Sequence, residues 1–148
     1  MSDQPNFIGV SFYALDAKNR LAIPAKMRLL IAKPRELILT RGLEGCLNLY
    51  QSETWKRMGE KLESMALKDR AAHRGFKRML FASASEVEFD DGGRILVPQP
   101  LAAYAALKRE AAIIGLGEKI EIWAAQRWIQ YEKRQRGSFV RYASQLEL

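Results

Sequence analysis

Two arginines stand at corresponding places in a repeated nonapeptide and offer the clearest chemistry in the sequence. Residues 16–24 read DAKNRLAIP and residues 90–98 read DDGGRILVP, so that Asp, Arg and Pro recur at the same spacing in both copies. A guanidinium is a planar fork that matches a phosphate or the O6 and N7 edge of guanine, whereas a lysine acts more as a point charge. Arg20 and Arg94, with Lys18 beside the first, are therefore candidate ligand-binding residues.

The sequence offers little for catalysis or for metal binding. The motifs of nucleophile elbows, P-loops and dinucleotide-binding helices are all missing from it. Cys46 and His73 are a poor nucleophile pair, because Cys46 begins an apolar strand and His73 lies in a basic stretch without an orienting carboxylate. Asp16, Asp90 and Asp91 could bind a metal, but turn chemistry already explains them, and an arginine four residues on opposes a cation. We expect no enzyme, no cofactor and no metal.

The composition is that of a folded, basic protein. Of 148 residues, 48% are hydrophobic and 28% charged, which suits one domain or two small repeats that share a core. A net charge of +7 favours a polyanionic partner such as nucleic acid or an anionic membrane surface. The single cysteine allows no internal disulfide, and no segment approaches the roughly 18 apolar residues of a membrane span. We therefore expect a soluble, cytoplasmic protein without a membrane partner.

Each nonapeptide is predicted to form the tip of a β-hairpin. The flanking strands are expected at residues 10–15 and 20–23 in the first copy, and at 86–89 and 94–97 in the second. Asn19 tolerates positive φ better than most residues, and Gly92-Gly93 supplies a turn free of Cβ clashes. Pro24 and Pro98 cannot donate to a ladder and should end their strands. In an alternative interpretation each arginine only pairs with its own aspartate, which as an exposed pair would contribute about 0–1 kcal/mol.

The sequence after each tip predicts further matching elements. These are short helices at 25–32 and 101–107, strands at 36–40, 46–50, 110–114 and 119–122, and helices from Ser52 as N-cap, over about 72–82, and from Trp128 to Gln135. The tail from Gly137 has no clear period and is expected either to be disordered or to dock on a neighbour. A lone hairpin is marginal in water, so each repeat should bury its apolar face against the other. We predict an α+β protein with a pseudo-two-fold barrel.

The order of these motifs resembles the MraZ family, whose members carry two AbrB-like repeats. The resemblance covers roughly residues 7–128, and its motifs are Phe7-x-Gly9, DAKNRLAIP followed by Arg28, CLNLY, Trp55, DDGGRILVP, LAAYAAL and GLGEKIEIW. It implies tandem swapped-hairpin β-barrel repeats, with repeats at 7–55 and 81–128, connecting helices at 56–80, and a C-terminal helix end and tail at 129–148. It also implies that protomers assemble into a ring.

The resemblance further implies a sequence-specific DNA-binding transcriptional regulator in the bacterial nucleoid. Family members act at short G-rich direct repeats in the promoter of the division and cell-wall gene cluster. The family's arginines match Arg20 and Arg94, with Asp16, Asp90 and Lys18 beside them. The chain departs from the family at Asn19, where Gly is usual, and at Asp91, an extra acid that should lower the phosphate affinity of the second tip.

Two other classes of function stay open. One is an adaptor ring that binds an acidic protein or a membrane through a basic helical stretch, whose charged residues are Lys56, Arg57, Lys61, Arg70, Arg74, Lys77 and Arg78. The other is a metal-dependent enzyme built on the three tip aspartates. Binding that depends on the tip arginines would favour DNA over both.

Overall fold

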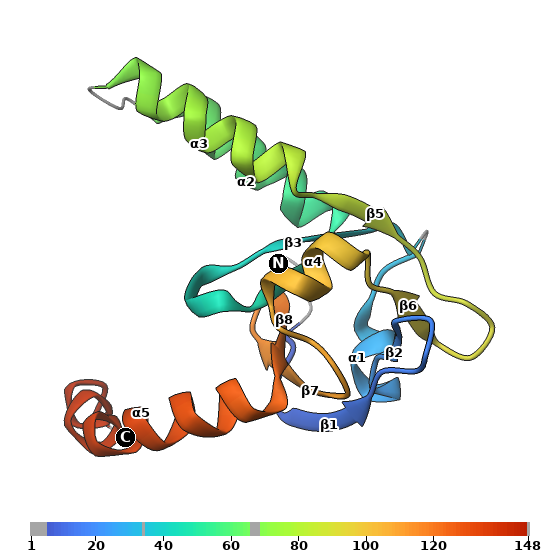
Figure 1. Ribbon diagram of the computed structural model, residues 1–148. Helices are drawn as coiled ribbons and strands as arrows, with labels where there is room; N and C mark the ends of the chain where they lie inside the picture. Colours follow the sequence, from blue (N-terminus) through green and yellow to red (C-terminus); the bar gives the residue numbers. More distant parts are fainter. Residues whose placement is uncertain (1–5, 34, 66–68, 148) are drawn as a thin grey trace.

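The computed structural model describes residues 6–33, 35–65 and 69–147 (Figure 1). The strands are β1 (Val10–Ala14), β2 (Arg20–Ala22), β3 (Leu37–Arg41), β4 (Leu47–Gln51), β5 (Ser85–Val87), β6 (Arg94–Leu96), β7 (Glu110–Leu116) and β8 (Lys119–Ala124). The helices are α1 (Ala25–Leu30), α2 (Ser52–Ser64), α3 (Arg70–Ala82), α4 (Gln99–Tyr104) and α5 (Ala125–Gln145), and a 3-10 turn, η1 (Leu43–Gly45), precedes β4. The protein is therefore α+β, as predicted.

The two halves exchange strands. A six-stranded antiparallel sheet has the order β1-β7-β8-β4-β3-β5, and β2 pairs with β6 in a separate two-stranded ribbon. The predicted local hairpins were therefore wrong in their pairing, because the strands on either side of each tip diverge. β1 pairs with β7 of the second half, and β5 pairs with β3 of the first. This interlocked pairing is the swapped-hairpin arrangement that the resemblance implied.

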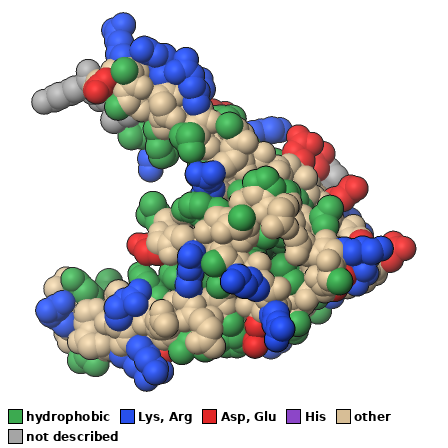
Figure 2. Space-filling model, viewed as in Figure 1, with side chains coloured by type: hydrophobic (Ala, Val, Ile, Leu, Met, Phe, Trp, Pro, Cys, Tyr) green, Lys and Arg blue, Asp and Glu red, His purple; other side chains and the backbone are tan. Residues whose placement is uncertain are grey.

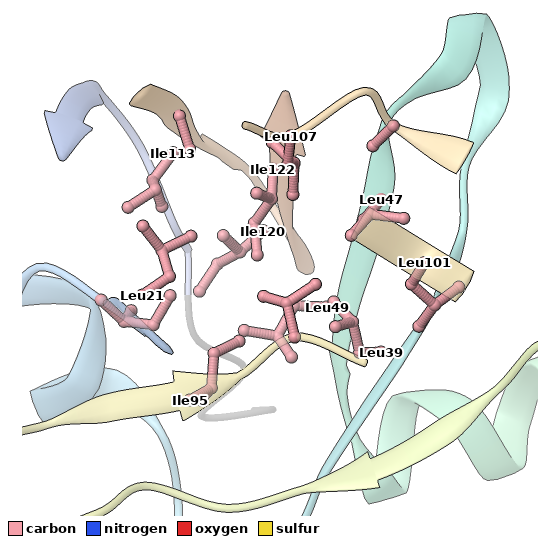
Figure 3. Packing of buried hydrophobic residues seen from close by; sticks show 14 of the residues in the cluster. Leu21, Leu39, Leu47, Leu49, Ile95, Leu101, Leu107, Ile113, Ile120 and Ile122 are labelled. Carbon is pink, nitrogen blue, oxygen red and sulfur yellow. The ribbon is translucent and has the colours of Figure 1, made fainter. Parts of the chain in front are cut away.

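One core serves both halves. Leu21 and Ile95 of the ribbon are fully buried, and Figure 3 shows them directed into one cluster with Leu49, Ile113 and Ile120 of the large sheet. Burying a Leu or Ile side chain stabilises a fold by about 1.5–3 kcal/mol. Since each half lends side chains to this cluster, the prediction that the repeats bury their apolar faces against each other is confirmed.

The helices differ from the prediction mainly at their ends. α1 and α4 begin directly after Pro24 and Pro98, which stand at their N-caps. The expected N-cap Ser52 is instead the first residue of α2, and its hydroxyl reaches the Glu36 carboxylate at 3.3 Å. α3 is capped by Asp69, which accepts hydrogen bonds from two backbone amides of the first turn.

The tail is helical, contrary to the expectation of a segment without period. α5 runs unbroken from Ala125 to Gln145 and includes Gly137. Phe139 and Tyr142 continue the spacing of three and four residues set by Trp128 and Tyr131, so the helical period extends through the tail. Among the helices that the structure describes, none combines the length and apolar character required to cross a bilayer.

Candidate nucleic-acid interface

The β2–β6 ribbon places both arginines on one face. Its register pairs Arg20 with Leu96, Leu21 with Ile95, and Ala22 with Arg94. Leu21 and Ile95 are 0% exposed and face the core. Since side chains alternate along a strand, Arg20 and Arg94 share the outward face of the ribbon. The sequence put them on two separate tips, and the strand exchange brings them together.

In the first tip, the Asp16 carboxylate holds both the turn and the arginine. Its Oδ1 accepts backbone hydrogen bonds from Lys18 and Arg20, each at 2.9 Å, and its Oδ2 accepts one from Arg20 Nε at 2.7 Å. The backbone hydrogen bond from Arg20 is the main reason that the pKa of Asp16 lies below its ordinary value. Asn19 takes the positive φ expected of it, at 60°.

The second tip repeats this arrangement. Asp90 Oδ1 accepts hydrogen bonds from the backbone of Gly92 and Arg94 at 2.9 Å, and Asp90 Oδ2 accepts one from Arg94 Nε at 3.0 Å. The pKa of Asp90 is also lowered, chiefly by the backbone hydrogen bond from Arg94. Gly93 occupies the place of Asn19 with φ 73°. In both tips the aspartate thus positions an arginine through its Nε.

The helices that follow the prolines cover the tip of the other repeat. Arg28 of α1 donates from Nε to the Ile23 carbonyl at 3.0 Å, and its guanidinium packs so closely on Gly93 that an added Cβ would lie 2.1 Å from Nη1. In the corresponding contact, Asn19 Nδ2 donates to Gln99 Oε1 of α4 at 2.8 Å. From the sequence, Arg28 is known only as part of a motif of the family that the chain resembles. The strand exchange explains its position beside the second tip.

Hydrogen-bonding capacity remains on the outward face. The clamp on each arginine uses Nε, and among the described residues Arg20 has no hydrogen bond from its terminal nitrogens, whereas Arg94 also donates from Nη1 to Asp16 Oδ2 at 3.4 Å. Lys18 and Asp91 are exposed beside them, and Leu96 is 56% exposed on the same face. Leu96 was missed from the sequence, although the alternation around buried Ile95 predicts that it faces outward. The outward face of the ribbon therefore presents the planar guanidinium groups of Arg20 and Arg94 beside the apolar side chain of Leu96.

The two tips together carry only a small positive net charge. Four cations, namely Lys18, Arg20, Arg28 and Arg94, stand against the three carboxylates of Asp16, Asp90 and Asp91. Long-range attraction of a polyanion by one such site is modest. The arrangement is better suited to short-range, directional recognition by held guanidinium groups.

The other candidate residues lie apart from this surface. Cys46 is buried, which raises the pKa of its thiol to about 12, and its Sγ donates to the Leu43 carbonyl. His73 lies on α3, where Nε2 is 3.1 Å from the Leu62 carbonyl. Across residues 6–33, 35–65 and 69–147, no three His, Cys, Asp or Glu side chains gather into a group that could hold a metal.

The basic stretch is divided between the two helices of a hairpin. Its members lie on α2 (Lys56, Arg57, Lys61) and α3 (Arg70, Arg74, Lys77, Arg78). Lys77 forms an ion pair with Glu63 across the hairpin. Figure 2 shows Lys and Arg side chains along the outer edge of this arm, well away from the ribbon.

Comparison with known proteins agrees with this architecture. Residues 7–78 and 80–147 each match the model of the MraZ protein family, and each segment holds one nonapeptide, which confirms the tandem repeat. A transcriptional regulator MraZ from Heliobacterium modesticaldum is 41% identical over 140 residues, covering 95% of this chain and 96% of the relative. Its counterpart from Thermomicrobium roseum is 46% identical over 122 residues, covering 82% and 84%. That from Clostridium acetobutylicum is 43% identical over 127 residues, covering 86% and 87%. The chain belongs to the MraZ family.

Proposed function

We propose that the protein is a sequence-specific DNA-binding transcriptional regulator whose reading surface is the outward face of the β2–β6 ribbon. The observation that carries this is the pair of arginines on that face, each held through Nε by the aspartate of its own tip. The relatives reported above carry the name transcriptional regulator. A two-stranded ribbon also has the width to enter the major groove of DNA.

Each residue of the surface has a distinct role in this proposal. Arg20 and Arg94 direct their terminal nitrogens at the O6 and N7 atoms of guanines, which fits G-rich repeats. Lys18 contacts a phosphate as a point charge. Asp16 and Asp90 position the arginines and do not themselves touch DNA. Leu96 is placed for apolar contact with a sugar or a thymine methyl group.

The weak net charge makes assembly important. If one protomer contacts about three phosphates, the slope of log affinity against log salt is only about −2.7. Several protomers in a ring that engage direct repeats about one helical turn apart gain affinity through effective concentration. We propose such a ring, acting in the nucleoid on the promoter of the division and cell-wall gene cluster.

The test compares arginines of the ribbon with an arginine elsewhere. DNA from upstream of the protein's own gene, with intact or scrambled direct repeats, is titrated in a fluorescence anisotropy assay. We expect Arg20→Ala and Arg94→Ala to lose the preference for intact repeats, while Arg74→Ala on α3, which removes the same charge, keeps it. Wild-type preference in both ribbon variants contradicts the proposed site. Loss of DNA binding in Arg74→Ala alone would place the DNA-binding site on the basic stretch and not on the ribbon.

A further inference from the structure

A groove of about 530 Å³ lies between the α2–α3 hairpin and the end of the sheet at η1 and β4. Its walls are largely apolar, and several of the side chains that form them are half exposed: Met65 at 46%, Phe76 at 56% and Met79 at 55%. Figure 2 shows hydrophobic side chains along the inner side of this arm, facing the hollow of the molecule. A concave, apolar space of this volume has the dimensions of a small-molecule site.

The groove also contains two buried polar groups with unused hydrogen-bonding capacity. Asn48 is 6% and Tyr50 7% exposed, and Asn48 Nδ2 donates to the Tyr50 hydroxyl at 3.0 Å. Asn48 Oδ1 is buried and lacks a partner among the described residues. Burial is the main reason that the pKa of Tyr50 is raised, so its hydroxyl keeps a proton that it can donate. A ligand that completes this pair must both donate and accept a hydrogen bond.

The charged groups around the groove are cationic. Its described lining includes Arg41, Lys61 and Lys119 and contains no Asp or Glu. Lys119 is paired with Glu121, with Nζ 3.3 Å from Oε2. Arg41 and Lys61 have no ion pair within the part of the chain that the structure describes, and the Arg41 guanidinium lies over the Tyr104 ring at 4.9 Å. Two cations are thus left to attract an anion into the groove.

These three properties together select one class of head group. A carboxylate or a sulfate ester is anionic but has no proton to donate to Asn48, and an alcohol can donate but carries no charge. A phosphate monoester combines both features, because its second pKa is about 6, so that part of it keeps a proton on the anion near neutral pH. The apolar walls require an alkyl chain beside that head group, and flexible methionines adapt to such a chain.

We propose that the groove binds a single-chain phosphate monoester of an apolar alcohol. The phosphate donates to Asn48 Oδ1, accepts from the Tyr50 hydroxyl and is attracted by Arg41 and Lys61. The alkyl chain lies along the wall that includes Met79. The groove is separate from the β2–β6 ribbon, and a duplex is too wide to enter it. The proposal therefore goes beyond DNA binding and does not rest on it.

A chain-matched series of ligands tests the head group without altering buried residues. Decyl phosphate, decyl sulfate and decanol are titrated into the full chain by isothermal titration calorimetry at pH 6, below the concentrations at which they form micelles. We expect decyl phosphate to bind, and decyl sulfate to bind at least fivefold more weakly, because it leaves Asn48 Oδ1 unsatisfied. Decanol should also bind at least fivefold more weakly, since it lacks the charge. Lengthening the phosphate ester should raise its affinity by up to about fourfold for each methylene that is buried.

Three exposed positions test the location. Met79→Asp places a negative charge on the apolar wall, and Lys61→Ala removes a cation from the lining. Lys56→Ala is the matched control, because Lys56 is exposed on the same helix but lies outside the groove lining. We expect the first two to bind decyl phosphate at least fivefold more weakly than wild type and the control to bind it equally well. Circular dichroism melts check that all three variants are folded.

Several results would overturn the proposal. Equal affinity for decyl phosphate and decyl sulfate would contradict the head group, and unchanged binding in both Met79→Asp and Lys61→Ala would place the ligand elsewhere. Binding to vesicles that contain phosphatidic acid, without binding to decyl phosphate, would assign the groove to a membrane surface. Because these titrations contain no DNA, loss of repeat preference with phosphate binding retained, or the reverse, refutes only one of the two proposals.

Discussion

The Asp16 carboxylate links the two tips, since its Oδ2 lies 2.7 Å from Arg20 Nε and 3.4 Å from Arg94 Nη1 of the other repeat. Asp90 holds only Arg94, at 3.0 Å. The pseudo-two-fold pair is therefore asymmetric in its electrostatics. One carboxylate fixes the relative position of both proposed base-reading groups.

Replacing Asp16 with Asn should affect DNA recognition more than the same change at Asp90. We expect Asp16→Asn to lower the affinity for intact repeats by roughly fivefold, the lower end of what one bidentate base contact contributes, with little loss on scrambled DNA. Asp90→Asn should lose less, because only Arg94 depends on it. Anisotropy titrations give the affinity of each variant for intact and for scrambled DNA, and the ratio of the two affinities measures specificity. Equal losses in the two variants would show that the cross-tip contact has no role.

Removing the negative charge of Asp91 should raise the affinity for DNA. Asp91 is exposed beside the second tip, where its negative charge repels phosphates. Asp91→Asn is expected to raise affinity for intact and scrambled DNA alike, by a few-fold at low salt, and the gain should shrink as salt is added. The same titrations at two salt concentrations measure this. A gain confined to intact repeats would place Asp91 near a base and not near the backbone.

Gly93 should not tolerate a side chain. Its φ of 73° costs an L-residue roughly 1–2 kcal/mol, and a Cβ there would collide with the Arg28 guanidinium. We expect Gly93→Ala to be destabilised by at least that amount in urea unfolding. Adding Arg28→Ala should recover the part due to the collision but not the part due to φ. Asn19→Gly, at the matching position, should change stability little.

The repeat, the tip residues and most elements could be predicted because they follow from local patterns. Asp, Arg and Pro recur at fixed spacing, and Asn19 and Gly93 meet the demand for positive φ. Strand pairing could not be predicted from the residues alone, because β1 pairs as well with β2 as with β7 on local grounds. The choice between these pairings depends on the long-range burial of side chains such as Leu21 and Ile95. Only the family resemblance, which implied a swapped hairpin, predicted the pairing that the structure shows.

The same limit explains what was missed at the site. Arg28 and Gln99 contact tips that are distant in sequence, so neither contact can be read from spacing. The helical end of α5 was missed for a different reason. Its apolar residues Phe139 and Tyr142 are exposed beyond the sheet, so they do not show the pattern of a helix packed on a core. Gly137 also interrupts the run of good helix formers.

Acid should loosen both tips. The pKa values of Asp16 and Asp90 lie below the ordinary 3.8, so each carboxylate stabilises the fold above that pH. This stabilisation is lost as the pH falls below 3.8 and through the folded-state pKa. We therefore expect the melting temperatures of wild type and the double variant Asp16→Asn, Asp90→Asn to differ most above pH 5 and to converge below 3.8. Circular dichroism melts across this range test it, and a constant difference would contradict it.

Substitution of the arginines by lysine separates base reading from charge. If Arg20 and Arg94 act only on phosphates, Arg20→Lys and Arg94→Lys should bind nearly as wild type, because the charge remains. If they read guanine through a planar fork, each change should cost about 1–3 kcal/mol on intact repeats, or roughly 5- to 150-fold in affinity. The salt slope should stay near wild type, since the number of cations is unchanged. We expect the second outcome, because Asp16 and Asp90 hold each guanidinium by Nε and a lysine has no equivalent atom for them to hold.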